Sequence, residues 1–248
     1  MFSFFRKKQF VHRTYGHLKV DMHSHLLPGI DDGAKNVEDS LAMIRQLMAL
    51  GYQKIITTPH IHSDYYPNTP ENIQSGLAHL REALKKAAIE IPIEAAAEYY
   101  VDEYFEDLLR QEAPLLTLPD KHVLIEVSML APNRKLPEVI FQLNLQGYQP
   151  ILAHPERYVY YGNQLEQFST FKNMGCLLQL NLLSLTGYYG KAQKKLGLQL
   201  LQAGLIDFVG TDLHHERQAQ ILEKALADHT MLQQLNGPIY RNANWEID

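Results

Sequence analysis

Two histidines, His23 and His25, stand two residues apart just after a short apolar segment at 18–20. If that segment is a strand, both imidazoles point to the same side, because side chains alternate between the two faces of a strand. They can then bind one metal ion together. A turn containing Pro and Gly at 28–33 brings Asp32 back toward the same place. Because His-x-His pairs also occur by chance, a metal site requires the same pattern to recur along the chain.

The pattern does recur, because most of the strands that we expect end in a histidine or a carboxylate. These strand ends carry His60, Glu98, Glu126, His154, Asp212 and His214. In a parallel barrel the carboxyl ends of all strands meet on one face, where active sites are built. Together with His23, His25 and Asp32, nine groups able to bind a metal converge on that face. The sequence therefore predicts a metal centre there.

The ligand types narrow the choice of metal. Five imidazoles and four carboxylates, with no thiolate, suit manganese, iron(II) or zinc better than copper(I) or calcium. Nine ligands are too many for one ion, so we expect two or three divalent ions. Three such ions would leave surplus positive charge over the four carboxylates. That surplus matches a phosphate monoester, which carries a charge of roughly −1.5 to −2 at neutral pH.

Two arginines are candidates for binding the phosphate. Arg157 follows His154 on the same rim, where a guanidinium can hold two phosphate oxygens at once; the alternative is a surface pair with Glu156. Arg217, five residues after Asp212, is the second candidate. We expect polar and aromatic residues to line the mouth of the site: Ser128, His62, His215 and the tyrosines within 65–66, 99–100, 158–161 and 188–189.

Strand-like and helical patterns alternate along the chain and would carry these residues. Apolar strand patterns lie at 18–20, 54–58, 91–97, 122–125, 149–153, 177–181 and 206–210. Amphipathic helical patterns lie at 36–49, 69–84, 102–110, 135–146, 164–174, 190–203 and 217–229, with a short one ending at 235. Strands this apolar favour a parallel arrangement covered by helices. We predict an α/β barrel, and an open doubly wound sheet is the alternative.

Composition limits the class of protein. The chain has 248 residues, of which 46% are hydrophobic and 21% charged, and its net charge is −5. This charge does not favour nucleic acid as a partner, and no apolar run approaches the roughly 18 residues of a membrane span. The single cysteine, Cys176, provides no disulfide framework and fits a reducing cytoplasm. We expect one domain over 19–248, preceded by an aromatic and basic N-terminal arm over 1–18.

Two other routes to phosphoryl chemistry are absent from the sequence. There is no Gly-x-x-x-x-Gly-Lys-Ser/Thr phosphate loop, which excludes nucleotide hydrolysis of that type. Cys176 begins an apolar strand pattern without a following arginine in a phosphate loop, which excludes a cysteine-nucleophile phosphatase. Any phosphatase chemistry in this chain must therefore use metal ions.

The motifs, taken in order, resemble those of a known superfamily. They are Asp-Met-His-Ser-His at 21–25, Asp-Asp-Gly at 31–33, Thr-Pro-His at 58–60, Leu-Ile-Glu at 124–126, Ala-His-Pro-Glu-Arg at 153–157 and Thr-Asp-Leu-His at 211–214. This set resembles the PHP (polymerase and histidinol phosphatase) superfamily. It is most similar to the bacterial manganese-dependent protein-tyrosine phosphatases of the CpsB/YwqE type, which are linked to capsule and exopolysaccharide synthesis. The resemblance covers residues 19–242.

The resemblance implies a distorted (β/α)7 TIM-like barrel with a trinuclear site, most readily of Mn²⁺. It gives the same nine residues a metal role and gives Arg157 a phosphate role. The sequence departs from the pattern in two places. His215 stands where Asn is common, and Gly-Thr precedes Asp212 where Ala-Ser is usual. These departures remove no ligand but leave the substrate preference open.

We therefore expect a metal-dependent phosphatase for phosphotyrosine in proteins, acting on a tyrosine kinase of capsule or exopolysaccharide synthesis. A hydroxide held by the metals would attack phosphorus, with Arg157, Asp212 and His60 as the catalytic groups. His60 or a metal-bound water would supply the proton to the leaving group, and the sequence does not choose between them. One alternative is a small-molecule phosphoesterase such as a histidinol phosphatase. The other is an inactive module that binds a kinase.

Overall fold

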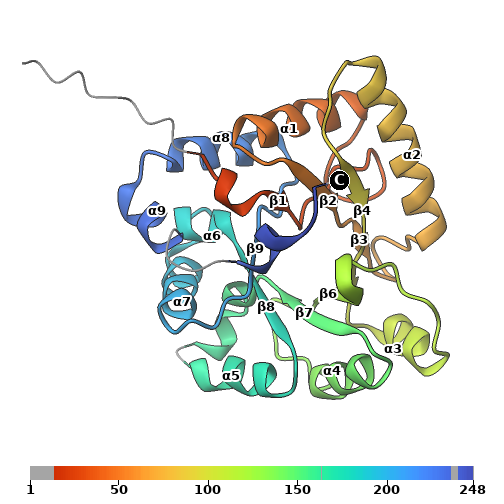
Figure 1. Cartoon of the computed structure of the whole chain (residues 1–248). Coiled ribbons are helices and arrows are strands. Elements are labelled where there is room, and N and C mark those ends of the chain that lie inside the picture. The colour runs from red at the N-terminus through yellow and green to blue at the C-terminus, as the bar shows by residue number, and fades with distance from the viewer. Residues whose placement is uncertain (1–13, 163, 236–239, 248) are drawn as a thin grey trace, which may run out of the picture.

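The computed structural model describes residues 14–162, 164–235 and 240–247. Its strands lie at the centre and its helices surround them (Figure 1). The strands are β1 (Val20–Asp21), β2 (Lys54–Thr57), β3 (His60–Ile61), β4 (Ile93–Ala95), β5 (Glu98–Tyr100), β6 (His122–Glu126), β7 (Gln149–Ala153), β8 (Leu177–Asn181) and β9 (Phe208–Gly210). The α-helices are α1 (Val37–Ala49), α2 (Pro70–Lys86), α3 (Glu103–Arg110), α4 (Leu136–Leu145), α5 (Leu165–Asn173), α6 (Leu182–Thr186), α7 (Lys191–Gln202), α8 (Glu216–Ala225) and α9 (His229–Leu235).

The strands form two parallel sheets, so the predicted α/β class is confirmed. One sheet has the order β1-β2-β4 and the other the order β3-β5-β6-β7-β8-β9. A single parallel bridge between Ser24 and Leu213 connects the chain just beyond β1 with the chain just beyond β9. Backbone hydrogen bonds thus define a three-stranded and a six-stranded sheet, where one closed barrel was expected.

The break between the sheets follows from the sequence of the second and third strand patterns. The strand pattern predicted at 54–58 corresponds to β2, and β3 begins beyond it at His60, because Pro59 between the two strands has no N–H to donate to a neighbouring strand. Its carbonyl instead accepts a hydrogen bond from Glu98 N at 3.1 Å. The pattern predicted at 91–97 likewise corresponds to β4, and β5 begins beyond it at Glu98. The two short strands β3 and β5, which were not predicted, therefore begin at two of the candidate ligands, His60 and Glu98.

Most predicted helices are present, and α1, α2 and α3 begin with side-chain N-terminal caps. The side chain of Asn36 accepts from Asp39 N at the start of α1. Thr69 and Asn72 form a reciprocal capping box at the start of α2, and Pro70 occupies the first turn. Asp102 caps α3. The short helix α6 (Leu182–Thr186) was not predicted, because its five mostly apolar residues give too short a period to recognise.

Hydrophobic packing has an inner and an outer part. The inner cluster lies among the strands and includes Val20, Ile56, Leu124, Ile151, Phe208 and Trp245. The larger outer cluster joins the strands to the surrounding helices. Trp245 comes from the C-terminal segment after the 3₁₀ turn Arg241–Asn244, and its ring lies 5.1 Å from that of Phe208. The C-terminal segment lies in front of the strands in Figure 1 and covers this end of the inner cluster.

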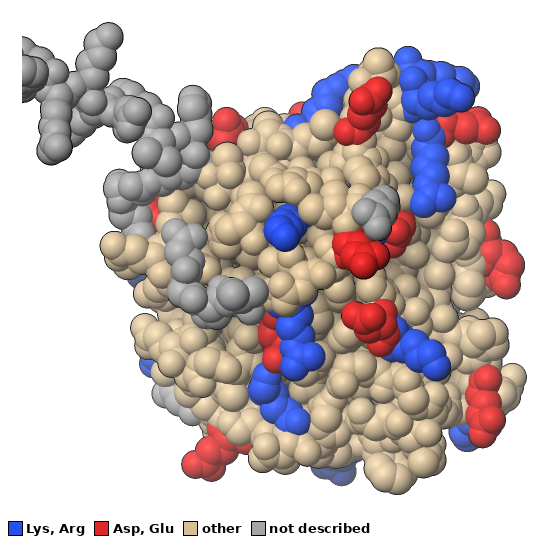
Figure 2. Space-filling view, viewed as in Figure 1, with Lys and Arg blue, Asp and Glu red and all other residues tan. Residues whose placement is uncertain are grey.

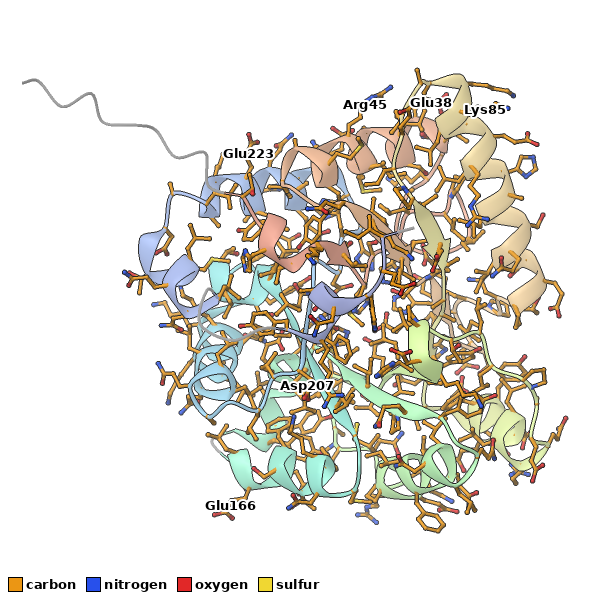
Figure 3. All side chains as sticks on the ribbon, in the orientation of Figure 1. Glu38, Arg45, Lys85, Glu166, Asp207 and Glu223 are labelled. Atoms are coloured by element: carbon orange, nitrogen blue, oxygen red, sulfur yellow. The ribbon has the colours of Figure 1, made fainter. Side chains whose placement is uncertain are left out.

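The outer surface carries mixed charge. On the face shown in Figure 2, Lys and Arg side chains alternate with Asp and Glu side chains over a surface made mostly of other residues. Glu38, Arg45, Glu166 and Glu223 lie at the periphery, whereas Asp207 lies nearer the strands (Figure 3). Among the described residues, no helix is both long and apolar enough to cross a membrane.

The predicted N-terminal arm falls partly outside the described residues, which begin at 14. Of its last residues, Tyr15 and Leu18 are fully buried in the outer cluster. The Tyr15 hydroxyl donates to the carbonyl of Leu222 in α8 at 3.0 Å. Residues 15–18 therefore pack with the domain.

Candidate metal centre

The segments that follow the first strand, β1, and the last strand, β9, meet at the mouth and position His23 and His25. Asp212 N donates to the carbonyl of His23 at 2.7 Å, and His25 N donates to the carbonyl of Leu213 at 2.9 Å. These bonds hold the segments after β1 and β9 side by side. As a result, His23, His25 and Asp212 face one another, all with side chains no more than 1% exposed.

All nine predicted ligands lie together in this mouth. They form four overlapping groups in which the potential ligand atoms lie within 4.8 Å of one another. The groups are His25, Asp32, His60 and His214; His23, His154 and Asp212; His23, His25 and Glu98; and His60, Glu98 and Glu126. Shared members such as Glu98 connect the groups into one continuous cluster.

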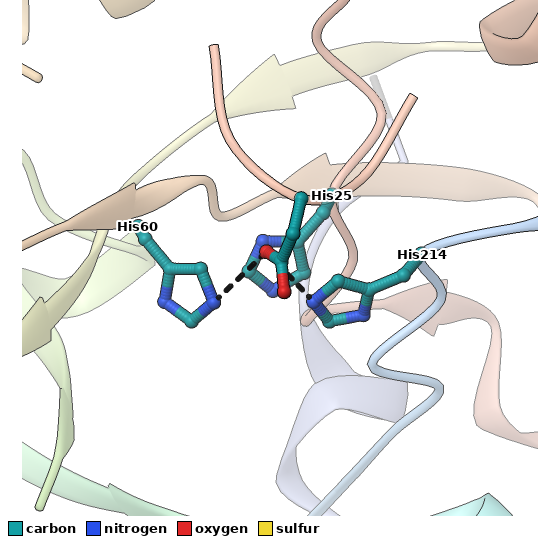
Figure 4. A group of neighbouring side chains, drawn as sticks. His25, His60 and His214 are labelled. Atoms are coloured by element: carbon teal, nitrogen blue, oxygen red, sulfur yellow. Dashed lines mark ion pairs between the residues drawn. The ribbon is translucent and has the colours of Figure 1, made fainter. Parts of the chain in front are cut away.

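The group around Asp32 is the most exposed part of the cluster. Figure 4 shows His25, His60 and His214 converging from three different segments. Asp32 Oδ1 lies 3.5 Å from His60 Nε2 and 3.5 Å from His214 Nε2, and dashed lines mark these two pairs. The rings of His25 and His214 stack with their centroids 3.9 Å apart. The Asp32 side chain is 52% exposed, so this group lies at the opening.

Glu98 is the centre of the buried part. Its Oε2 atom lies 3.2 Å from His23 Nε2, 3.5 Å from His25 Nε2 and 3.1 Å from His60 Nδ1. Its Oε1 atom lies 3.1 Å from His154 Nε2. Glu126 is adjacent, with Oε1 3.4 Å from His154 Nε2. The carboxylates at the start of β5 and at the end of β6 therefore face the same set of imidazoles.

Hydrogen bonds on the outer side of the rings orient the imidazoles. His23 Nδ1 lies 2.8 Å from Gln179 Oε1, which can only accept, so Nδ1 carries the hydrogen. His25 Nδ1 lies 2.8 Å from Asp31 Oδ2, with the same consequence. His214 Nδ1 donates to the carbonyl of Asp212 at 2.9 Å. In their neutral forms these three rings therefore direct an Nε2 lone pair into the cluster.

This arrangement of donor atoms fits bound cations. Glu98 Oε2 is buried and makes no hydrogen bond within the described part of the chain, although Nε2 atoms of His23 and His25 face it. In the neutral tautomers neither Nε2 atom carries a hydrogen, so two nitrogen lone pairs and a carboxylate oxygen face one another without a hydrogen bond. A divalent cation satisfies all three at once.

The pKa shifts of the cluster residues show how strongly their charges interact. Burial disfavours the charged form of His25, but Asp31 and the nearby carboxylates outweigh burial and raise the pKa of His25 well above its usual range. Burial and the charge of Glu98 raise the pKa of Glu126. Burial opposes ionisation of Asp32, yet His214 and His60 lower the pKa of Asp32 to about 2. Crowded carboxylates attract positive charge, which protons supply when cations do not.

Two of the candidate ligands have a strained backbone. His154 has a φ of 32° and Asp212 a φ of 50°, both in the left-handed region. Residues other than Gly adopt this region at a cost of about 1 to 3 kcal/mol, mostly where function requires it. Here the left-handed turn ends β7 at His154, and the following 3₁₀ turn Pro155–Arg157 brings the arginine back to the mouth.

Arg157 borders the cluster, as predicted for a phosphate-binding residue. Its Nη1 donates to Asp212 Oδ2 at 3.0 Å, and its guanidinium lies 4.5 Å from the centroid of the Tyr189 ring. The predicted alternative, a surface pair with Glu156, is not formed among the described ion pairs. Glu156 is fully buried and accepts hydrogen bonds from Asn181 N and Ser184 Oγ instead.

The cluster opens into a cleft of about 440 Å³ with an aromatic wall. Lining residues include His60, Arg157 and Asp212 at its base and Tyr65, Tyr66, Tyr100, Met129, Tyr188, Tyr189, His62 and His215 around it. Among the described lining residues, Ser128 and Arg217 are absent. Arg217 is exposed in the first turn of α8. Tyr99 and Tyr158, which were expected at the mouth, are buried in the core.

Sequence reasoning did not assign a role to three residues that organise the site. Asp31 and Gln179 orient His25 and His23, and Asn181 donates to Asp212 Oδ2 at 2.7 Å. Gln179 and Asn181 share one face of β8, because they are two residues apart. That spacing on a strand otherwise made of leucines was the available signal.

The parallel α/β fold is similar to that of PHP-type phosphatase structures, and its mouth holds a candidate metal centre. Residues 19–231 match the family described as "Capsular polysaccharide synthesis, CpsB/CapC", and the chain belongs to this family.

Curated relatives carry matching names. The chain is 33% identical over 198 residues to "Tyrosine-protein phosphatase YwqE" of Bacillus subtilis (strain 168), covering 79% of this chain and 77% of that protein. It is 30% identical over 202 residues to "Tyrosine-protein phosphatase CpsB" of Streptococcus pneumoniae, covering 79% of this chain and 83% of that protein.

Solved structures extend the likeness to the fold. A crystal structure from work on YwqE of Bacillus subtilis and CpsB of Streptococcus pneumoniae, described as unique metal-dependent tyrosine phosphatases, matches with a TM-score of 0.77 and 30% identity. It covers 91% of this chain and 90% of that one. A histidinol phosphatase described as putative, from Listeria monocytogenes, matches with a TM-score of 0.50 at 14% identity, covering 81% and 97%. At that identity the second match concerns the fold alone.

Proposed function

We propose that this protein is a metal-dependent phosphatase that hydrolyses phosphotyrosine in proteins. The observation that carries the proposal is the continuous cluster of nine ligands beside Arg157, at the base of a cleft with an aromatic wall. Membership of the CpsB/CapC family and the names of the relatives at 30% and 33% identity support the same activity.

The residues of the site would have three roles: metal binding, phosphate binding and contact with the aryl ring. The nine residues of the four groups would hold divalent ions, which when bound activate water and neutralise negative charge on a phosphoryl group. Arg157 contributes a guanidinium at the same place, where it can bind phosphate oxygens. The buried base admits the phosphoryl group, while Tyr66, Tyr100 and Tyr189 supply apolar surface for an aryl ring.

We assign His60 to metal binding rather than to proton transfer. Burial lowers the pKa of His60 to about 4, so at neutral pH the ring is a neutral imidazole and not an acidic imidazolium. A tyrosinate leaving group has a pKa of about 10 and needs less protonation than an alkoxide. Arg157 and Asp212 remain the proposed catalytic pair at the reacting group, with their contact at 3.0 Å. Arg217 would bind phosphate only after its exposed side chain turned toward the cleft.

The finer features of the prediction are part of the proposal. We propose two or three Mn²⁺ ions, with Fe²⁺ or Zn²⁺ as alternatives, and a distorted (β/α)7 barrel over 19–248. The Ser24–Leu213 bridge and the pairing of the β2/β3 and β4/β5 segments support seven strand positions around one axis. The proposed partner is a bacterial tyrosine kinase of capsule synthesis, in a reducing cytoplasm that suits the lone Cys176.

Metal analysis joined to activity assays tests the proposal. The protein is stripped with a chelator, dialysed and assayed with para-nitrophenyl phosphate and a phosphotyrosine peptide before and after addition of Mn²⁺. We expect activity only after metal is restored, and two or three ions per chain by elemental analysis. Asp212→Ala should lose the activity. If Asp212→Ala kept full activity, or if histidinol phosphate were hydrolysed far faster than the peptide, the proposal would be wrong.

A further inference from the structure

Strand β8 (Leu177–Asn181) differs from its neighbours in the sheet, because neither it nor the residues just after it belong to the four groups of candidate ligands. The adjacent strands β7 and β9 are each followed by a candidate ligand. The inward-facing side chains of β8 at this end are the amides of Gln179 and Asn181, both fully buried. Gln179 binds the outer nitrogen of His23. A buried amide beside a charged cluster must satisfy several hydrogen bonds, so the partners of Asn181 indicate its role.

The orientation of the Asn181 amide is fixed by the helix that follows it. Asn181 Oδ1 accepts from Leu183 N at 2.8 Å and so caps α6. The amide nitrogen must then point the other way, toward the mouth. There it donates to Asp212 Oδ2 at 2.7 Å and to the hydroxyl of Tyr189 at 3.2 Å. Both hydrogens of the NH₂ group are therefore used.

The two oxygens of Asp212 have separate sets of partners. Oδ1 faces the imidazoles, 3.3 Å from His23 Nε2 and 3.4 Å from His25 Nε2. Oδ2 accepts from Asn181 Nδ2 and from Arg157 Nη1. The hydrogen bond from Asn181 thus sets the rotation of a carboxylate that serves the metal side with one oxygen and the arginine with the other.

Arg157 has two described supports, and Asn181 touches both. One support is Asp212 Oδ2 and the other is the face of the Tyr189 ring, 4.5 Å from the guanidinium carbon. A carboxylate partner and an aromatic face together fix the orientation of the planar guanidinium, so its remaining N–H groups point in one direction. The guanidinium borders the cleft, because Arg157 and Tyr189 both line it.

We propose that Asn181 is a positioning residue for phosphate binding: it fixes Asp212 and Tyr189, which together hold Arg157 toward the cleft. This inference rests on the proposed phosphatase function. Asn181 is fully buried and lies behind the lining residues, so it acts through them and does not touch the substrate.

Asn181→Asp is the informative substitution. The new carboxylate keeps the oxygen that caps α6 but removes both donors and places negative charge against Asp212 Oδ2. We expect the inhibition constant of inorganic phosphate and the KM for para-nitrophenyl phosphate to rise by about tenfold or more, since hydrogen bonds to charged groups have about this effect. The Mn²⁺-loaded protein is used, with bound Mn²⁺ and the unfolding midpoint measured on the same samples.

Tyr189 variants separate the two supports of Arg157, and a remote asparagine provides the control. Tyr189→Phe keeps the ring under Arg157 but removes the hydroxyl that Asn181 binds, so it should raise the phosphate inhibition constant less than Asn181→Asp does. Tyr189→Leu also removes the aromatic face and should raise it further than Tyr189→Phe. Asn144→Asp is the matched control, because Asn144 Nδ2 also donates to two acceptors, the carbonyls of Ile140 and Met174, away from the cleft. It should lower the unfolding midpoint without changing phosphate inhibition.

The outcomes separate the inference from the function on which it rests. Wild-type protein that neither hydrolyses aryl phosphate nor is bound by phosphate with Mn²⁺ present overturns the proposed function. Active wild-type protein whose Asn181→Asp variant retains phosphate inhibition and KM within twofold overturns the positioning role alone. So does an Asn181→Asp variant whose only losses are in stability and match those of Asn144→Asp. A selective rise in both constants, with Mn²⁺ content retained, supports it.

Discussion

At the residue scale, the site depends on groups behind the ligands as much as on the ligands themselves. An imidazole can present either nitrogen to a cation, and the partner of the other nitrogen decides which one. Asp31 decides this for His25, and Gln179 for His23. Asp31 also accepts from Gly33 N and His60 N, so it couples the loop before α1 to β3.

Asp31→Ala should therefore weaken metal binding although Asp31 belongs to none of the four ligand groups. Loss of such an outer partner typically lowers metal affinity by about 10- to 100-fold. Competitive titration of Mn²⁺ against a chelating dye measures the change. Asp228→Ala, an exposed aspartate that accepts from Thr230 N at 2.9 Å, removes a remote carboxylate and should leave the affinity unchanged. Equal Mn²⁺ affinity in Asp31→Ala and wild type would contradict the orienting role.

The residues of the cluster were predictable from sequence, but the residues behind them were not. A histidine or acid at the end of an expected strand marks a candidate ligand, because the ends of parallel strands converge. Nothing in the sequence says which of the adjacent residues Asp31 and Asp32 faces the cluster and which lies behind it. Gln179 and Asn181 carry no charge, and their spacing on a leucine-rich strand marks a shared face but not a role, which only their contacts reveal.

At the element scale, the loop between β1 and α1 folds back on itself, so that Gly33 lies unusually close to the backbone of His25. A Cβ added to Gly33 would lie 2.1 Å from the carbonyl oxygen of His25 and 2.5 Å from its Cβ. Backbone hydrogen bonds fix this approach, since Ala34 N donates to the His25 carbonyl at 3.0 Å. A side chain at position 33 would push Asp32 and His25 apart.

Gly33→Ala should consequently lower both stability and metal affinity. Overpacking of this kind costs about 1 to 3 kcal/mol, and the displaced loop carries Asp32. Gly76→Ala is the contrasting variant. Its added Cβ lies 3.5 Å from Leu27 Cδ1, and alanine in a helix interior is favoured by about 0.5 to 1 kcal/mol. Urea unfolding of the two variants should shift in opposite directions, and a stable Gly33→Ala protein with normal Mn²⁺ affinity would refute the close approach.

Helices were predicted well where the amphipathic period runs over several turns, as in the helices that Asn36 and Thr69 cap. Elements were predicted less well where tertiary contacts decide. The two-residue strand β3 begins after Pro59, beyond the predicted strand, and pairs with β5, so no sequence period marks it. Short α6 exists because Asn181 caps it and because Leu182, Leu183 and Leu185 are buried against the core.

At the scale of the whole molecule, the end of the strands opposite the metal centre contains a buried histidine. The His122 ring lies 5.4 Å from that of Phe208 and 5.8 Å from that of Trp245. Its Nδ1 contacts the carbonyl of Pro119. Burial lowers the pKa of His122 below its usual 6.5, an effect that Pro119 only partly offsets.

This histidine should make stability fall with acidity. The unfolded chain binds a proton below about pH 6.5 more readily than the folded one, so stability is present above that pH and is lost as the pH falls through the lowered pKa. His122→Gln keeps a donor for Pro119 but cannot be charged. Its urea midpoint should therefore change less between pH 7.5 and pH 5.5 than that of the wild type, both with Mn²⁺ bound. Parallel curves would contradict the assignment.

Function and stability should oppose each other in this molecule, because the four carboxylates in one mouth repel unless cations are bound. Binding at a hundredfold excess over the dissociation constant adds about 2.7 kcal/mol, or roughly 5 to 10 °C in Tm for a chain of this size. We therefore expect chelation to lower the Tm by that amount.

Burial and Glu98 raise the pKa of Glu126, so Glu126→Gln should raise the Tm of the stripped protein but reduce the gain in Tm on adding Mn²⁺. In thermal unfolding, Glu126→Gln should be more stable than the wild type when both are stripped of metal and less stable when both are loaded with Mn²⁺. A variant less stable in both states would mean that packing, not charge repulsion, dominates at Glu126.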